Sequence, residues 1–351
     1  MKVGIQLVVS NHEGATDADM FRTEVQLGVE AEAMGFDFVG LVEHHFTDYA
    51  MCPDNAQVLS YIAAKTRTLQ LMPAAFILPW NNPLRVIEKM VMLDIQSEGR
   101  ALLGMGRGLS RREFDGFGVD MAESRERFDQ AAAIILEGLE SGFVEADTPF
   151  YKQPRVEVRP RPERGFKGRS YMVGMSPSSV ETAAKHGLAC LKFSQGNWEE
   201  SVPDLDSYRS KFKAYQGVEA PPFIIADMVV CFDSEAKVRD YAARHLRRHY
   251  ETLLDFYEMR GSHFSSMPSY ANYAAAADYL NSTDADELFR NYMAANLVGT
   301  PEQIVEQHRK RAAIVGDHDL AVTFSYGSMP FADMWEQAKL FADKVLPHLK
   351  G

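Results

Sequence analysis

Four consecutive residues, Glu43, His44, His45 and Phe46, bring a carboxylate and two imidazoles together at one point of the chain. They follow an apolar run over 36–42 that is typical of a buried strand. Imidazole is the side chain best suited to proton transfer near neutral pH, and a strand holds it on rigid backbone. A catalytic pair and ordinary hydrogen-bonded histidines explain the run equally well from these residues alone.

A metal site is a weaker interpretation of the two histidines. Adjacent residues of a strand point to opposite faces of the sheet, whereas two metal ligands from one strand need alternate positions. The sequence also contains no HExxH motif. We therefore expect no bound metal.

Two further stretches carry groups that suit an anion. Residues 104–109 alternate glycine with Met105, Arg107 and Leu109, and the arginine offers several donors to a phosphate. Because these glycines fall on alternate positions, the stretch does not form the GxGxxG dinucleotide motif. Residues 176–179 follow another expected strand and open a helix, where hydroxyls and free N–H groups can hold a phosphate. A plain helix N-cap explains this turn equally well.

The elements that position these residues alternate along the chain, as βα units do. The expected strands are 3–9, 36–42, 69–78, 101–106, 170–174, 189–193, 222–231 and 319–325. The expected helices are 18–34, 55–66, 83–98, 121–142, 177–187, 204–215, 235–260 and 331–349. Eight strands, each followed by a helix, favour an α/β fold of the (β/α)8 TIM barrel type over an open doubly wound sheet.

Two stretches interrupt the alternation and predict insertions at the barrel rim. Residues 143–169 contain several prolines and an alternating segment over 155–159, which predicts a short hairpin. Residues 261–296 are rich in Ser, Tyr, Ala and Asn and predict a partly helical insertion, a kind of segment that often serves as a lid. We expect residues 1–351 to form a single barrel domain that carries both insertions.

Composition limits the location and the partners of the protein. The net charge of −12 and the pI near 5.4 argue against nucleic acid or an anionic membrane as a partner. Cys52, Cys190 and Cys231 form no CxxC motif and suggest neither a disulfide framework nor a zinc site. The chain has no 18-residue apolar stretch, and its first apolar run is too short for a signal peptide. We expect a cytoplasmic protein.

Several motifs, taken in their order and spacing, resemble the bacterial luciferase-like flavin-dependent monooxygenases, and among them the luciferase α subunit. These motifs cover nearly the whole chain and lie at 43–46, 71–79, 107–109, 117–125, 298–302 and 340–347. The resemblance implies a TIM barrel that binds reduced FMN at the carboxyl end of its strands. It also implies that O2 adds to the flavin to give a peroxyflavin, which oxygenates a small organic substrate.

The resemblance also implies a role for particular residues. His44 would be the general acid/base of the flavin–oxygen chemistry, with His45 and Glu43 beside it in the catalytic site. The residues implied to bind the cofactor are Ala74, Ala75, Gly106, Arg107, Leu109, Glu113, Arg125, Met175, Ser176 and Ser179.

Among these cofactor residues, the phosphate grip is implied to consist of Arg107, Arg125, Ser176 and Ser179. The bond between Ala74 and Ala75 would be a cis peptide beneath the isoalloxazine ring. Two positions depart from light-emitting luciferase, because Gly106 replaces a reactive cysteine and Met175 replaces a glutamate.

The partners follow from the same resemblance. The chain has no convincing NAD(P)H fingerprint, which suggests a separate flavin reductase as the donor of reduced FMN. A homodimer, or a heterodimer with a related subunit, is implied as well. Two alternatives stay open: a deazaflavin-dependent oxidoreductase of the same fold, and a non-catalytic flavin-binding subunit. The intact run of Glu43, His44 and His45 favours an enzyme over the silent subunit.

Overall fold

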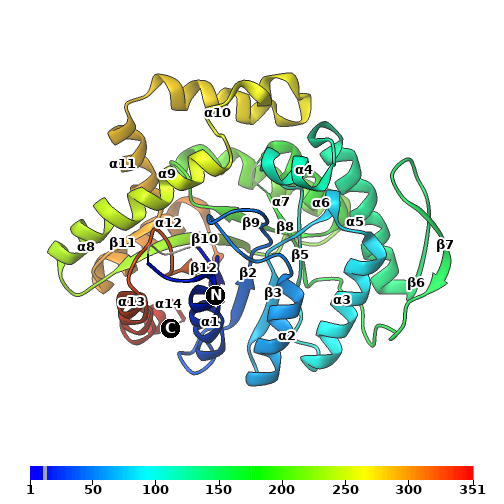
Figure 1. Ribbon diagram of the computed structural model, residues 1–351, viewed down its shortest axis with the longest axis horizontal. Helices are drawn as coiled ribbons and strands as arrows, with labels where there is room; N and C mark the ends of the chain where they lie inside the picture. The colour runs from blue at the N-terminus through cyan, green and yellow to red at the C-terminus, as the bar shows by residue number, and fades with distance from the viewer. Residues whose placement is uncertain (11–13, 175, 351) are drawn as a thin grey trace.

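A computed structural model of the chain describes residues 1–10, 14–174 and 176–350, and a parallel sheet lies at its centre (Figure 1). Each of the eight expected strands is present. In chain order they are β1 (Val3–Leu7), β2 (Phe38–Leu41), β3 (Gln70–Pro73) with β4 (Phe76–Ile77), β5 (Leu103–Gly106), β8 (Ser170–Val173), β9 (Ala189–Phe193), β10 (Phe223–Cys231) and β12 (His318–Thr323).

The sheet closes into a barrel because the segment containing β3 and β4 has a neighbour on both sides. β3 pairs in parallel with β2, and β4 pairs in parallel with β5. Leu71 of β3 also bridges Ala101, just before β5. The remaining strands follow in the order β2, β1, β12, β10, β9, β8 and β5. The predicted TIM barrel is confirmed.

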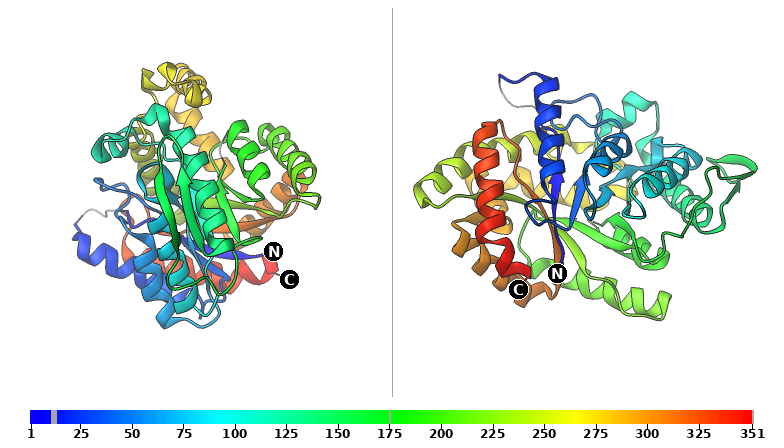
Figure 2. Two further views of the ribbon diagram at one scale, coloured as in Figure 1. Left: turned by 90° about the vertical axis from the view of Figure 1, so that its right-hand side faces the viewer. Right: turned by 90° about the horizontal axis from the view of Figure 1, so that it is seen from below.

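Helices surround the strands on the outside (Figures 1 and 2). The long helices are α1 (Asp17–Glu30), α2 (Asn55–Lys65), α3 (Pro83–Gln96), α5 (Ser124–Ser141), α6 (Pro177–His186), α7 (Val202–Gln216), α9 (Arg247–Phe256), α12 (Pro301–Val315) and α13 (Phe331–Lys344). Side-chain caps define several starts, since Asp54, Asn82 and Ser176 each accept from a backbone N–H of the first turn. No helix within the described part of the chain is long and apolar enough to cross a membrane.

Some elements differ from the expectation. The strand predicted over 69–78 is divided into β3 and β4 at the Ala74–Ala75 bond, which is cis. The helix predicted over 235–260 consists of α8 (Glu235–Tyr241), a π-helical turn (Ala242–Leu246) and α9. Helix α12 was not among the expected helices, although Thr300 and Gln303 form a capping box at its start. Helix α4 (Arg111–Phe117) and the short strand β11 (Leu297–Gly299), which pairs with β10, were not expected either.

Both predicted insertions have the expected type of structure. β6 (Phe143–Asp147) and β7 (Lys152–Glu157) form an antiparallel hairpin that projects from one side of the molecule (Figure 1). α10 (Ala271–Ser282) and α11 (Ala285–Ala295) form the helical insertion, which extends beyond α9 at the top of the same view. The second insertion thus stands over one end of the barrel.

Strand residues alternate between two apolar layers. Val3, Ile5 and Leu7 of β1 belong to the large core between the sheet and the helices. Alternate residues of other strands, including Phe38 and Ala321, form a second cluster inside the barrel. This alternation sends the intervening residues of β1, Gly4 and Gln6, toward the barrel interior.

Candidate active site

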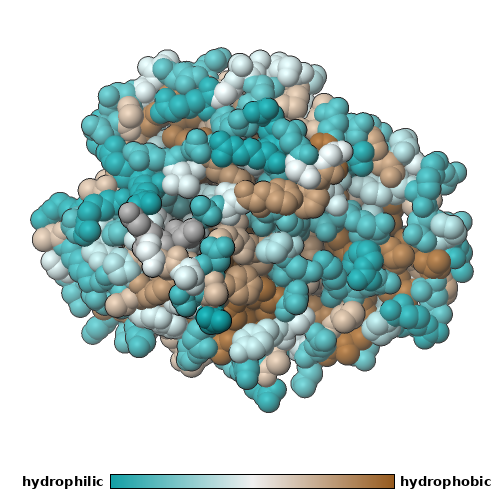
Figure 3. Space-filling model, in the orientation of Figure 1, coloured by the Kyte–Doolittle hydropathy of each residue, from teal (hydrophilic) through white to brown (hydrophobic). Residues whose placement is uncertain are grey.

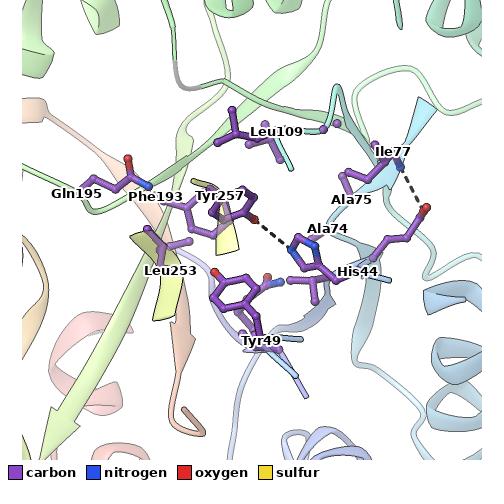
Figure 4. A pocket seen from close by; sticks show the side chains of 18 of the residues that line it. His44, Tyr49, Ala74, Ala75, Ile77, Leu109, Phe193, Gln195, Leu253 and Tyr257 are labelled. Carbon is purple, nitrogen blue, oxygen red and sulfur yellow. Dashed lines mark hydrogen bonds between the residues drawn. The ribbon is translucent and has the colours of Figure 1, made fainter. Parts of the chain in front are cut away.

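A pocket opens at the carboxyl ends of the barrel strands, and side chains from distant parts of the chain line it (Figure 4). Its walls come from the ends of β1, β2, β5, β9 and β10, from the Ala74–Ala75 bond, and from α9. Its lining combines apolar side chains with polar ones, among them Gln6, Glu43, His44 and Asn296. Such a lining is typical of a small-molecule or cofactor site.

His44 is the central titratable group of the pocket. Its Nδ1 lies 3.0 Å from Oε1 of Glu113. Its Nε2 lies 3.2 Å from the hydroxyl of Tyr257, a contact that Figure 4 shows as a dashed line. Because an ionised carboxylate only accepts hydrogen bonds, we place the imidazole proton on Nδ1, which leaves Nε2 as an acceptor. Burial raises the pKa of Tyr257 well above its usual value, so the phenol stays protonated and donates to Nε2.

Glu113 is buried and holds the backbone of the histidine pair as well as the ring. Its Oε1 also accepts from the backbone N–H of His45 at 2.8 Å. Glu113 lies in the first turn of α4, where the positive helix end favours a negative charge. The carboxylate therefore fixes both the orientation and the tautomer of His44.

The ring of His45 points away from the pocket. Its Nε2 lies 3.2 Å from Oε1 of Glu43, and its ring packs edge-on against Phe117. Glu43 lines the pocket and also accepts from Nε1 of Trp80 at 2.7 Å and Nδ2 of Asn81 at 2.8 Å. Within the described ranges, no group of three or more metal-ligating side chains occurs.

Small side chains form a floor of the pocket. Ala74 and Ala75, joined by the cis peptide, line the pocket together with Gly106 and Leu109. A Cβ atom on Gly106 would lie 2.9 Å from Cδ1 of Ile77 and 3.4 Å from Cβ of Ala75. Any larger residue at 106 would therefore crowd this floor.

The predicted phosphate grip forms a cluster of cations and hydroxyls. Nη2 of Arg125 lies 3.0 Å from Oγ of Ser178 and 3.3 Å from Oγ of Ser179. Ser176, the N-cap of α6, lies 3.0 Å from Ser179, Oγ to Oγ. The cluster thus combines a guanidinium, three hydroxyls and a helix N-terminus, which are all groups that bind anions.

The carboxylate of the half-buried Asp129 interacts electrostatically with both arginines of this region. Neither Arg107 nor Arg125 forms a direct ion pair in the described residues. Burial, and then the neighbouring guanidinium of Arg107, lowers the pKa of Arg125. Arg107 donates to the carbonyl of Ser269 at 2.8 Å and stacks on Tyr270, which belongs to the helical insertion. Two guanidinium groups without a direct ion pair in the described residues, offset in part by Asp129, suit an anionic ligand such as a phosphate.

The predicted residues do not all reach the pocket surface. Glu43, His44, Ala74, Ala75, Gly106, Arg107, Leu109, Glu113 and Ser179 line it. Arg125 and Ser176 stand behind Ser179 in the cluster, and Met175 lies outside the described residues. Sequence reasoning missed Tyr257 and Gln6, which also line the pocket. For Tyr257, 213 residues from His44, no local pattern signals the contact.

Comparison with known proteins identifies the family and its curated members. The family model described as luciferase-like monooxygenase matches residues 1–318. The alkanal monooxygenase alpha chain of the Kryptophanaron alfredi symbiont is 26% identical over 358 residues, which cover 100% of this chain and 99% of that protein.

Solved structures share the fold at lower identity. Monooxygenase RslO1 from Streptomyces bottropensis has a TM-score of 0.82 and 24% identity, over 99% of this chain and 100% of that one. The oxygenating constituent of 3,6-diketocamphane monooxygenase from Pseudomonas putida, solved with FMN, has a TM-score of 0.75 and 18% identity, over 99% and 98%. An F420-dependent secondary alcohol dehydrogenase has a TM-score of 0.75 and 12% identity, over 100% and 99%. The chain belongs to the luciferase-like monooxygenase family.

Proposed function

We propose that this protein is a monooxygenase that uses reduced FMN and O2 to oxygenate a small organic substrate, and that residues 1–351 act as one barrel domain. The proposal rests on two groups of residues that lie at one pocket. One is the arginine–serine cluster around Arg125, and the other is the hydrogen-bonded series of Glu113, His44 and Tyr257. A phosphate grip beside a proton-transfer group suits a phosphorylated redox cofactor.

FMN fits the residues on the basis of charge and shape. Arg107, Arg125, Ser176 and Ser179 would hold the phosphate, because the two guanidinium groups form no direct ion pair within the described structure and Asp129 offsets only part of their charge. The floor formed by Ala74, Ala75 and Gly106 would accept the ring. In the bound state, reduced FMN supplies the electrons that activate O2.

The protein's own contribution is proton transfer and exclusion of water. Nε2 of His44 is free to accept a proton when the hydroxyl of Tyr257 turns toward a ligand, and the carboxylate of Glu113 then stabilises the charged imidazole. Apolar walls that include Ile77, Leu109 and Phe193 keep the reaction away from bulk water.

Partners follow from the same proposal. A separate reductase would supply reduced FMN, and free buried cysteines suit a cytoplasmic location. A second copy of the chain would cover the exposed apolar side chains of α2 and α3, which are Tyr61, Met92 and Ile95 with 54%, 49% and 37% exposure. Figure 3 shows hydrophobic side chains gathered between polar ones over this part of the surface.

The first prediction separates the proposed activity from its alternatives. Under anaerobic conditions the protein should bind reduced FMN more tightly than reduced coenzyme F420, and admission of O2 with a panel of alkanals and ketones should give an oxygenated product. Tighter binding of F420, with hydride transfer and no oxygen uptake, would establish the deazaflavin oxidoreductase instead. Binding of FMN without any reaction would establish the non-catalytic subunit.

The second prediction concerns His44. The His44→Ala variant should keep the affinity for reduced FMN, because the phosphate grip lies elsewhere, while the yield of oxygenated product falls about 100-fold or more. The His45→Ala variant is the matched control and should lose less, because its ring lies against Glu43 and Phe117. Product yield per reduced FMN is the measurement, and an unchanged yield in His44→Ala would refute the role.

The third prediction concerns assembly. Sedimentation equilibrium should give the mass of two chains, and Met92→Glu should shift the species toward one chain because it places a charge in an apolar interface. A single-chain mass for the unmodified protein, at concentrations up to about 0.1 mM, would contradict the dimer.

A further inference from the structure

Gln6 is a buried amide that the proposed chemistry does not use. It lies on β1, its side chain lines the pocket, and only 2% of the residue is exposed. Among the residues that the structure describes, neither its Nε2 nor its Oε1 has a hydrogen-bond partner. A buried amide without partners is costly, and such groups persist mainly where a ligand or a water satisfies them.

The backbone around Gln6 makes room for this side chain. Gln6 lies in register with Gly40 of β2, and a Cβ atom on Gly40 would come 2.3 Å from Oε1 of Gln6. The same Cβ would lie 3.4 Å from Cβ of Ala74. The amide therefore occupies the space that the glycine leaves beside the predicted flavin floor.

A second unpartnered polar group lies in the same layer of the barrel. β1 pairs with β12 as far as Ile5 and Val322, so the next residues, Gln6 and Thr323, are neighbours. The hydroxyl of Thr323 is buried and has no hydrogen-bond partner in the described part of the chain either. The surrounding interior is apolar and includes Ala74 and Ala226. Gln6 and Thr323 thus form a small polar spot within the apolar wall at this end of the barrel interior.

Strand order places this spot opposite the phosphate grip. β1 and β8 lie on opposite sides of the closed barrel, and the grip follows β8 at the start of α6. A ligand whose phosphate is bound at the grip would extend across the mouth toward β1. The amide then faces either the far edge of that ligand or a second molecule beside it.

We propose that Gln6 is a specificity-determining residue that binds a donor–acceptor edge, meaning a carbonyl next to an N–H or O–H group, as in a lactam or an imide. Nε2 of Gln6 donates to the carbonyl and Oε1 accepts from the N–H or O–H group. Two sources offer this chemistry, namely the organic substrate and the pyrimidine edge of bound FMN. The inference builds on the proposed function, which predicts that a flavin occupies the mouth.

One arm of the test uses the protein without flavin. The binding of 2-piperidone, which has the full edge, is compared by NMR titration with that of N-methyl-2-piperidone, which lacks the N–H group. We expect the first to bind about tenfold more tightly, and Gln6→Leu to remove the difference. Met228→Leu changes another pocket wall without removing a polar group and should keep the difference.

The other arm uses reduced FMN and its N3-methyl derivative under anaerobic conditions. An affinity difference that disappears in Gln6→Leu assigns the edge to the flavin, whereas a difference in the lactam arm alone assigns it to the substrate. Either result supports the proposal.

Failure of the proposal is distinct from failure of the proposed function. If neither pair of probes shows a difference that depends on Gln6, a buried water satisfies the amide and the proposal is overturned. Failure of reduced FMN to bind at all would refute the flavin function, whereas the comparison of the two lactams would still test the role of Gln6.

The melting temperature of Gln6→Leu provides a further readout. It should stay the same or rise, because an unpartnered amide is removed, and a fall of several degrees would indicate a structural role and contradict the proposal.

Discussion

The carboxylate of Glu113 makes the contacts on which the rest of the site depends. It binds the ring of His44 and the backbone of His45, and so joins the end of β2 to the helix that follows β5. Because the carboxylate is buried, its charge acts in a medium of low polarity and strongly favours one tautomer of the ring. The position of the Nε2 atom, and with it any proton transfer in the pocket, follows from this one interaction.

The arginines of this barrel have two kinds of surroundings. Arg311 forms a bidentate salt bridge with Asp227, in which Nη1 lies 2.6 Å from Oδ2, and Ser194 donates a hydrogen bond to the same carboxylate. The two charges of that group balance each other. Arg125 and Arg107 have hydroxyl, carbonyl and aromatic neighbours and no direct ion pair among the residues described, and Asp129 offsets only part of their charge. A partly compensated pair of this kind is costly in the free protein, and a bound phosphate would reduce the cost.

Sequence reasoning predicted the features that local pattern controls. Apolar runs located all eight barrel strands, and the motif order located nine of the residues that line the pocket. The helix α12 was missed although Thr300 and Gln303 signal its start. Tyr257 and the unpartnered state of Gln6 had no local signal, because strand register and long-range packing create them. The outward turn of His45 likewise depends on Glu43, Trp80 and Phe117 meeting in space.

The central claim is that the cluster around Arg125 is a phosphate grip that holds reduced FMN over the Ala74–Ala75 floor. The most direct measurement is anaerobic titration of the protein with reduced FMN and with reduced riboflavin, which differ only in the phosphate. Charge-assisted hydrogen bonds predict that FMN binds roughly 100-fold more tightly or better, and that Arg125→Met removes most of this preference. Equal affinities for FMN and riboflavin in the unmodified protein would contradict the account.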